Sequence, residues 1–237
     1  MDINNLKIKL FADGAEIKDI IEFNNKPFIR GFTTNPTLMK QSGVSSYKTF
    51  ANKIIKIIGD KSISFEVLSD DFNEMVRQGR EIASWGENIY VKIPITNTKG
   101  IATTSVIKNL VQQGCKLNIT AVMTVDQITN VVNYLDSSIP SYISIFGGRI
   151  ADTGRDPIEI FEVAKDKTRE LRKCEIIWAS PRELLNIFQA EKVGCHIITL
   201  TNELLKKLPL IGKDLANYSQ ETVKMFVEDA IKSELKL

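Results

Sequence analysis

The sequence predicts an α/β protein of the (β/α)8, or TIM, barrel class, and three observations lead to this prediction. Short apolar segments alternate along the chain with longer segments of amphipathic, helical spacing. Eight such strand–helix units fit a chain of 237 residues. All but the last of these apolar segments end in a polar residue, which is typical of barrel strands that lead into a site. A doubly wound open sheet is the alternative, but the dinucleotide fingerprint that it often carries is absent.

The strands are expected at the apolar segments, each of which is bounded by turn residues. They cover residues 7–13, 28–33, 62–67, 89–93, 117–121, 142–145, 175–179 and 195–200. Amphipathic spacing predicts the helices between them, mainly over residues 16–24, 45–58, 70–83, 103–113, 125–133, 157 onward, 181–191 and 202–207. An additional C-terminal helix is expected over about 219–235, with Ser219 as its cap and an apolar face. We expect a single barrel domain over 1–237.

The composition is that of an ordinary globular protein, with 43% hydrophobic and 25% charged residues and a net charge of +2. Charges of both signs are mixed along the chain, so we expect neither a nucleic-acid partner nor a membrane-binding face. The first five residues lack the basic start and apolar run of a signal peptide. No apolar run is long enough to span a bilayer. These features predict a cytoplasmic protein.

Cysteine and histidine usage argues against several kinds of site. The cysteines Cys115, Cys174 and Cys195 lie far apart without metal-ligand or redox spacing, so we expect buried, reduced thiols. His196 is the only histidine, which nearly excludes a histidine zinc site or a Ser-His-Asp triad. His196 is expected at a strand position. We predict no metal ion.

The most informative segment is Tyr90-Val91-Lys92-Ile93-Pro94, which is apolar around one lysine. A run this short is typical of a buried parallel strand. Burial disfavours the charged ammonium of a lysine, and the free amine is then available to attack a carbonyl carbon. The alternative is that Lys92 ends the strand in solvent or paired with a carboxylate, as buried lysines usually are.

Polar residues follow the other predicted strands at their carboxyl ends, where the site of a barrel lies. Each has an ordinary explanation as a turn, capping or neutralising residue. Together they bring one lysine, two carboxylates and several neutral hydrogen-bonding groups to one cavity, which suits imine chemistry on a polyhydroxylated carbonyl compound. The set is Asp13, Thr34, Asn35, Glu66, Lys92, Asn118, Thr120, Ser144 and Ser180.

Two arginines extend this set. Arg149 follows Gly147-Gly148, and Arg182 follows Ser180-Pro181 at the start of a predicted helix. Glycines allow backbone to approach an anion, a helix start offers free amides, and a guanidinium matches phosphate oxygens. Each arginine alone is equally well explained by a surface ion pair. Because barrel enzymes often bind phosphate near their last strands, the two together favour a phosphorylated substrate.

At this point the chain resembles the transaldolase family of class I aldolases. Seven segments carry the resemblance, and they occur in the family order. They are Phe11-Ala12-Asp13, Thr33-Thr34-Asn35-Pro36-Thr37-Leu38, Phe65-Glu66-Val67, Val91-Lys92-Ile93-Pro94, Asn118-Ile119-Thr120-Ala121, Ser144-Ile145-Phe146-Gly147-Gly148-Arg149-Ile150 and Ala179-Ser180-Pro181-Arg182.

The resemblance implies a role for each of these positions. Lys92 would form a Schiff base with the C2 carbonyl of a ketose phosphate, and Asp13 would take the C4 hydroxyl proton. Glu66 would move protons through a water that Thr120 holds. Asn35, Asn118 and Ser144, with Thr34 beside them, would bind the three-carbon unit, and Arg149, Ser180 and Arg182 the phosphate. The resemblance implies phosphorylated sugar substrates in carbohydrate metabolism (the pentose phosphate pathway), no cofactor, and a homo-oligomer by analogy.

The family has two branches. Glu66 and Phe146 are the residue types typical of the branch that transfers dihydroxyacetone to an aldose phosphate, so in this respect the chain resembles that branch. The other branch, fructose-6-phosphate aldolases, typically carries Gln and Tyr there and releases free dihydroxyacetone. A barrel that binds phosphosugars without this chemistry is a third possibility. It is suggested by departures from the family pattern, which usually has proline at Ile145 and valine at Gly147, and by Glu183 beside the expected phosphate site.

Overall fold

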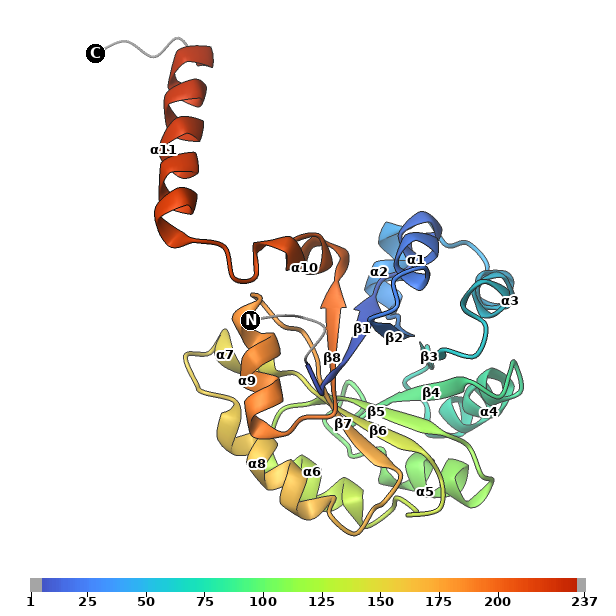
Figure 1. The fold of residues 1–237 in the computed structure, drawn as a ribbon. Coiled ribbons are helices and arrows are strands. Elements are labelled where there is room, and N and C mark those ends of the chain that lie inside the picture. Colours follow the sequence, from blue (N-terminus) through green and yellow to red (C-terminus); the bar gives the residue numbers. More distant parts are fainter. Residues whose placement is uncertain (1–5, 234–237) are drawn as a thin grey trace.

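The computed structural model describes residues 6–233, and its centre is a closed barrel in which every strand pairs in parallel with its neighbours (Figure 1). The strands follow one another around the barrel in chain order, and this confirms the predicted (β/α)8 class. They are β1 (Lys9–Asp13), β2 (Ile29–Thr33), β3 (Ser62–Glu66), β4 (Ile89–Pro94), β5 (Leu117–Val122), β6 (Ser141–Ile145), β7 (Cys174–Trp178) and β8 (Ile197–Thr201).

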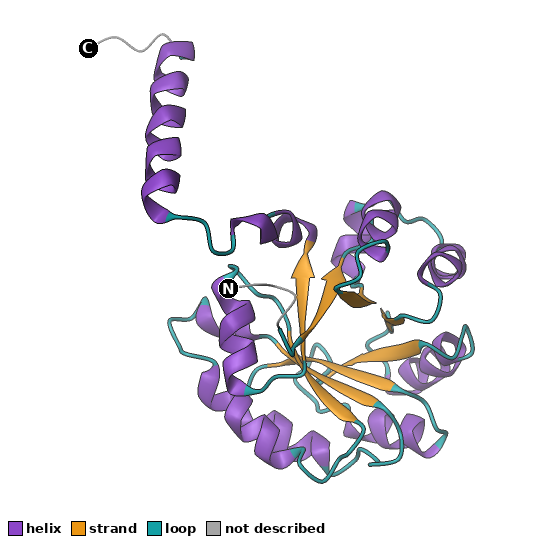
Figure 2. Ribbon diagram, in the orientation of Figure 1, coloured by secondary structure: helices purple, strands orange, loops and turns teal. Residues whose placement is uncertain are grey.

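Helices surround the strands, and one further helix extends away from the barrel at the C-terminal end (Figure 2). The helices after the first three strands are α1 (Ile17–Asn24), α2 (Pro36–Gln41), α3 (Tyr47–Ile58) and α4 (Phe72–Ala83). Those after the next three are α5 (Thr104–Gln112), α6 (Val125–Val132), α7 (Gly147–Ala151) and α8 (Ile158–Lys167). The last are α9 (Leu185–Val193), α10 (Asn202–Lys206), the 3-10 helix η2 (Leu208–Leu210) and α11 (Leu215–Lys232).

Side-chain caps fix where several helices begin. The side chains of Ser46 and Asp71 accept hydrogen bonds from the third backbone N–H of α3 and α4. Thr124 and Gln127 form a reciprocal capping box at α6. Asn35 caps α2 by accepting from the backbone N–H of Leu38 at 3.0 Å. This last cap fixes the backbone just after β2, where a predicted site residue lies.

Two predicted helix starts are wrong. The C-terminal helix begins at Leu215 and is capped by Asp214, so Ser219 lies inside it. Its predicted end, at residue 235, lies outside the described residues. Helix α9 begins at Leu185 rather than 181. Strand β6 ends at Ile145, as predicted, and a short helix that the sequence did not predict, α7, follows it at Gly147.

An aromatic layer fills the barrel interior below the site. Phe11 and Tyr142 meet edge to face at 6.0 Å, and Tyr142 stacks on Tyr90 with ring centroids 3.9 Å apart. Each of these three residues lies two positions before a cavity residue on its strand, so its ring points to the same, inner side of the barrel. Gly31 makes room for this layer, because a Cβ there would lie 2.5 Å from the Phe11 ring. These rings pack together beneath the polar residues.

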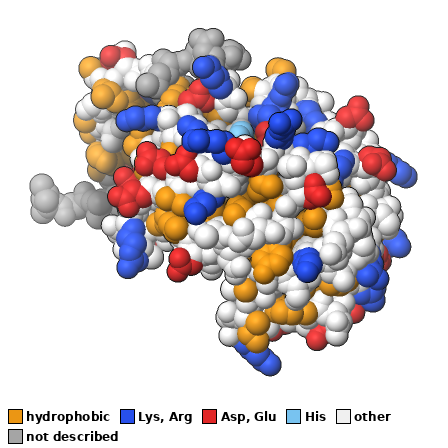
Figure 3. Space-filling view, turned by 90° about the horizontal axis from the view of Figure 1, so that it is seen from below, with side chains coloured by type: hydrophobic (Ala, Val, Ile, Leu, Met, Phe, Trp, Pro, Cys, Tyr) orange, Lys and Arg blue, Asp and Glu red, His pale blue; other side chains and the backbone are white. Residues whose placement is uncertain are grey.

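The surface seen from below, in Figure 3, carries basic and acidic side chains together and no patch of a single sign. His196 is exposed and directly precedes β8, and its Nδ1 accepts from the backbone N–H of Ile176 at 3.0 Å. His196 therefore misses the expected strand position by one residue.

All three cysteines are buried and free, as predicted. Within residues 6–233, no helix has the length and apolar character needed to cross a membrane.

Candidate active site

A cavity of about 490 Å³ opens at the carboxyl ends of the strands. It brings together residues from both halves of the sequence, which is the usual consequence of closing a barrel. Ten of the twelve predicted site residues lie on its wall: Asp13, Asn35, Glu66, Lys92, Thr120, Ser144, Phe146, Arg149, Ser180 and Arg182. The barrel therefore brings most of the predicted residues together in one cavity.

Lys92 is almost completely buried, with 6% of its surface exposed. Its Nζ donates to the backbone carbonyl of Thr34 at 2.9 Å and lies 3.3 Å from Oε2 of Glu66. Adjacent strands cause this pairing, because Glu66 and Lys92 are register partners between β3 and β4. The amine is therefore fixed at the cavity wall beside a single carboxylate. Burial and pairing with a carboxylate were the alternatives expected for Lys92, and in the structure it is both buried and paired.

Asp13 shares the cavity from β1. Its Oδ1 accepts from the hydroxyl of Thr33 at 2.7 Å, and Thr33 also lies 2.6 Å from the hydroxyl of Thr199. Burial raises the pKa of Asp13, while the charge of Lys92 and the hydrogen bond from Thr33 oppose this rise. A carboxyl group in these surroundings is suited to accepting and returning a proton.

The wall between Lys92 and the sixth strand is made of neutral polar groups. The Thr120 hydroxyl is buried and has no hydrogen-bond partner among the described residues. The next residue, Ala121, has a φ of 59°, and the pairing of β5 with β6 is irregular there. Non-glycine residues in this conformation are uncommon and often mark functional sites. Ser144 completes this wall and donates to Asn118 Oδ1 at 2.7 Å.

Two predicted site residues, Thr34 and Asn118, are not on the cavity wall. Both are fully buried. The Thr34 hydroxyl donates to the carbonyl of Ser64, and Asn118 Nδ2 donates to the hydroxyl of Ser64 at 2.9 Å. Their contribution in this structure is indirect. Thr34 holds the Lys92 amine through its carbonyl, and Asn118 orients the Ser144 hydroxyl.

The two predicted anion-binding arginines differ in their surroundings. The Arg182 guanidinium makes a two-pronged ion pair with Asp152, in which Nε lies 3.1 Å from Oδ1. Arg149 lies 6.0 Å above the Phe146 ring, and no ion pair of Arg149 is found within residues 6–233. Glu183 is exposed and absent from the cavity wall. The acid that contacts Arg182 is therefore Asp152 rather than Glu183.

The glycine pair before Arg149 is required by close packing. A Cβ on Gly147 would lie 2.7 Å from the Trp178 ring, which stacks on Phe161 at 4.3 Å. A Cβ on Gly148 would lie 1.6 Å from the backbone oxygen of Ser180. The family usually has valine where this chain has Gly147, and here the large Trp178 ring leaves no room for a side chain. Ile145 is fully buried in the core outside the cavity.

Sequence reasoning missed several residues that shape the site. Thr33 and Thr199 line the cavity, and a polar residue within an apolar strand was the available signal for Thr199. Asn186 is buried, and its Oδ1 accepts from the backbone N–H groups of Arg182 and Glu183 at 2.8 and 3.2 Å. This bond holds the loop before α9 out of the helix, which explains why α9 begins late. Ser180 in that loop has a φ of 56°.

The arrangement combines a buried amine, two carboxylates that share its cavity, and two arginines on the cavity wall. An amine of this kind can add to a carbonyl carbon and form an imine. Asp13 and Glu66 lie in different surroundings, so they can move protons at different positions of one substrate. Arg149 and Arg182 favour an anionic group at the entrance.

Residues 10–237 match the family described as Transaldolase/Fructose-6-phosphate aldolase. A protein named "Probable transaldolase" from Nitrosopumilus maritimus is 34% identical over 229 residues, covering 94% of this chain and 98% of that protein. Proteins of the same name from Dehalococcoides mccartyi and Streptococcus agalactiae are 31% and 32% identical. They cover 89% and 90% of this chain and 96% and 97% of their own lengths.

Among solved structures, the chain is similar to 2,3-dimethylmalate lyase, a PEP mutase/isocitrate lyase superfamily member. The TM-score is 0.52 at 11% identity, over 98% of this chain and 86% of the lyase. This similarity concerns the fold alone.

Proposed function

Because the chain belongs to the transaldolase/fructose-6-phosphate aldolase family, we propose that it is a transaldolase acting through a lysine Schiff base. The donor is a ketose phosphate such as fructose 6-phosphate. The acceptor is an aldose phosphate such as erythrose 4-phosphate, and the unit transferred is dihydroxyacetone. The observation that carries the proposal is the buried Lys92 amine, which faces the same cavity as two carboxylates.

In the proposed reaction the Lys92 amine adds to the C2 carbonyl carbon, and loss of water gives an iminium ion. Asp13 takes the proton from the C4 hydroxyl, the C3–C4 bond breaks, and its electron pair is held as an enamine on Lys92. The aldose phosphate leaves. Addition of an acceptor aldehyde reverses these steps, and Asp13 returns the proton. Glu66, through a water bound by Thr120, serves imine formation and hydrolysis.

We propose that the rest of the cavity binds the two ends of the substrate. Asn35 and Ser144 hold the hydroxyls of the three-carbon unit, and Thr34 and Asn118 orient these groups from behind. Arg149, Ser180 and Arg182 bind the phosphate. The support for this assignment is the position of the two guanidinium groups on the cavity wall and the buried Ser144–Asn118 hydrogen bond of 2.7 Å.

The test is borohydride trapping with fructose 6-phosphate in the absence of an acceptor, read by peptide mass spectrometry. A reduced three-carbon adduct on the Lys92 peptide is expected. It would support both Schiff-base chemistry and the transfer branch, because the bound unit waits for an acceptor. No adduct with any ketose phosphate on folded protein would overturn the mechanism. Acceptor-independent cleavage would identify an aldolase instead.

Phe146 offers a second test of transfer against release. Phe146 lines the cavity and carries no hydroxyl that could position a hydrolytic water. We expect Phe146→Tyr to increase release of free dihydroxyacetone about tenfold, the equivalent of one added hydrogen bond. The rate of release without acceptor is the measurement. Phe146→Leu, which removes the ring and adds no hydroxyl, is the control and should not increase release.

We also propose that the protein is a homo-oligomer held together by α11. This helix has no buried residue, and Figure 1 shows it projecting away from the barrel. Its exposed apolar residues include Phe226 at 62% and Ile231 at 73% exposure. An apolar helix face of this extent is typical of a protein–protein contact. A second copy of the chain is the partner proposed.

Replacing Phe226 and Ile231 together by serine should therefore lower the assembly state. Analytical ultracentrifugation at micromolar concentration is the measurement, and the expected result is a shift from the oligomer to a single chain. Lys224→Ser, on the same helix, is the matched control and should leave the mass unchanged. A wild-type protein that sediments as a monomer would contradict the proposal.

A further inference from the structure

Three side chains from neighbouring strands form a chain of short hydrogen bonds on the cavity wall. Thr33 on β2 donates to Asp13 on β1 at 2.7 Å, and Thr199 on β8 lies 2.6 Å from Thr33, oxygen to oxygen. Strand β1 lies between β2 and β8, and Asp13 and Thr33 are register partners. Both threonines are nearly buried, at 2% and 5% exposure. The barrel itself therefore sets these distances.

The hydrogen bonds that join Asp13, Thr33 and Thr199 can run in either of two directions, depending on whether Asp13 is ionised. When Asp13 is ionised, Thr199 donates to Thr33, and Thr33 donates to the carboxylate. When Asp13 holds a proton, it can donate to Thr33, which then donates to Thr199. The first direction ends in a charge-assisted bond, which is the stronger kind, and a second hydroxyl strengthens it cooperatively. The pair can therefore serve both states of the carboxyl group while favouring the ionised one.

We propose that Thr33 and Thr199 are positioning residues that hold Asp13 in place and keep it ionised for proton abstraction. This inference rests on the proposed function only for the role of Asp13 in catalysis; the hydroxyl chain itself does not depend on it. Neither threonine transfers the proton to or from substrate. Thr33 acts on Asp13 directly, and Thr199 acts through Thr33.

Other charged groups share the cavity with Asp13, and Lys92 among them lowers the pKa of Asp13. They are Lys92 from β4, Glu66 from β3, and Arg149 and Arg182 at the entrance. On the side of α1 and α10, Asp19 is hydrogen-bonded to Asn202. None of these groups is altered by changing a threonine to valine, so such a variant isolates the hydroxyl. Valine keeps the branched shape that suits a strand.

The experiment is a carbon-13 NMR titration of the aspartate carboxyls in the resting protein, with Asp13→Asn used to assign the signal. Burial raises the pKa of Asp13, and the Thr33 hydrogen bond lowers it. Removing that bond in Thr33→Val should therefore raise the titration midpoint by about one pH unit or more. Thr33→Ser should restore it, and Thr199→Val should shift it in the same direction by less.

A matched control is Thr168→Val, which removes another buried hydroxyl that is bonded to a helix carbonyl outside the cavity. It should not move the midpoint. In the active enzyme, kcat/KM for bond cleavage falls as the pH drops through the midpoint of Asp13. In Thr33→Val this fall in kcat/KM on the acid side of the pH profile should therefore occur at higher pH.

An unchanged midpoint in folded Thr33→Val overturns the inference. If that variant does not fold, an unchanged midpoint in Thr199→Val overturns it equally. The titration needs no turnover, so it separates this inference from the proposed function. If wild-type protein gives no borohydride adduct, the catalytic role proposed for Asp13 is contradicted. If an adduct forms but the midpoint of Asp13 does not move in Thr33→Val, only the role of the threonines is contradicted.

Discussion

Replacing Lys92 by methionine should abolish borohydride trapping and lower the rate of dihydroxyacetone transfer by on the order of 10⁶-fold. This is the scale seen when a serine protease loses its nucleophile. Methionine has a similar length and no amine, so it fills the buried space without leaving a cavity. The loss would appear in kcat, since no covalent intermediate can form. The measurement is single-turnover cleavage of fructose 6-phosphate.

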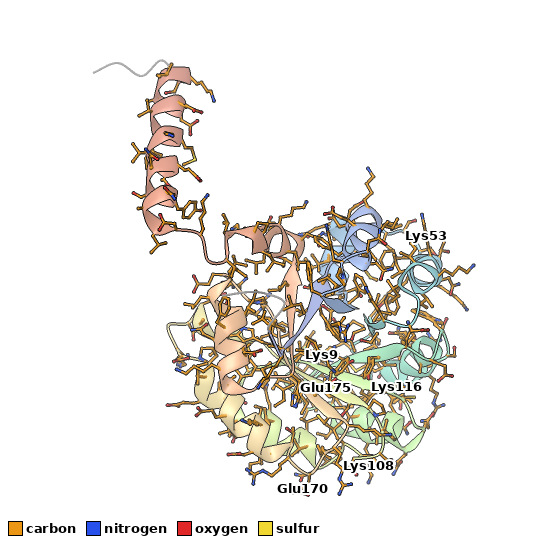
Figure 4. All side chains as sticks on the ribbon, viewed as in Figure 1. Lys9, Lys53, Lys108, Lys116, Glu170 and Glu175 are labelled. Carbon is orange, nitrogen blue, oxygen red and sulfur yellow. The ribbon has the colours of Figure 1, made fainter. Side chains whose placement is uncertain are left out.

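Lys9→Met is the control for this variant. Lys9 begins β1 and pairs with Glu175 at 2.6 Å, and Figure 4 labels the two side chains close together. Neither residue lines the cavity. The Lys9 side chain is 45% exposed. It should retain wild-type turnover. Lys92→Met with full activity would show that another group carries the reaction.

Replacing Gly148 by alanine should lower the free energy of unfolding by about 3 kcal/mol or more. The added Cβ would lie 1.6 Å from the Ser180 carbonyl oxygen and 3.2 Å from Arg182 Cγ. A backbone oxygen cannot rotate aside as a side chain can, so the loop that carries both residues must move. In protein that still folds, kcat/KM for phosphorylated substrates should fall on the order of 100-fold, as for other 1 Å displacements.

Thermal unfolding and steady-state kinetics check the two parts of this prediction. Gly14→Ala is the control for stability, because a Cβ there would meet only ordinary contacts at 3.5 Å or more. Its melting temperature should stay close to that of the wild type. Wild-type stability and wild-type KM for Gly148→Ala together would mean that the approach of the two loops has no consequence.

Much of this site could be predicted because a barrel converts strand ends into neighbours. Lys92 and Glu66 follow from two short apolar runs, each with one charged residue near its carboxyl end. Once the strands are parallel and closed, these ends must share one cavity. Asp13 follows by the same reasoning. The predictions needed only the order and length of the strands, which apolar periodicity reveals.

The remaining features depend on register and loop conformation, which periodicity does not determine. The bond between Thr33 and Thr199 exists because β2 and β8 flank β1 and both threonines line the cavity inside the barrel. The ion pair of Arg182 with Asp152 joins two loops that are 30 residues apart. Helix α9 starts late because Asn186 binds the backbone of the preceding loop. Each depends on contacts between segments that no local pattern connects.

The aromatic layer of Phe11, Tyr90 and Tyr142 has a kinetic consequence. Because these rings fill the barrel interior below the amine, donor and acceptor would both reach Lys92 through the cavity that Arg149 and Arg182 line. Under the proposed function, the first aldose phosphate must depart before the second can enter. Double-reciprocal plots at several acceptor concentrations should then be parallel, and excess acceptor should inhibit by occupying the free enzyme in place of the donor.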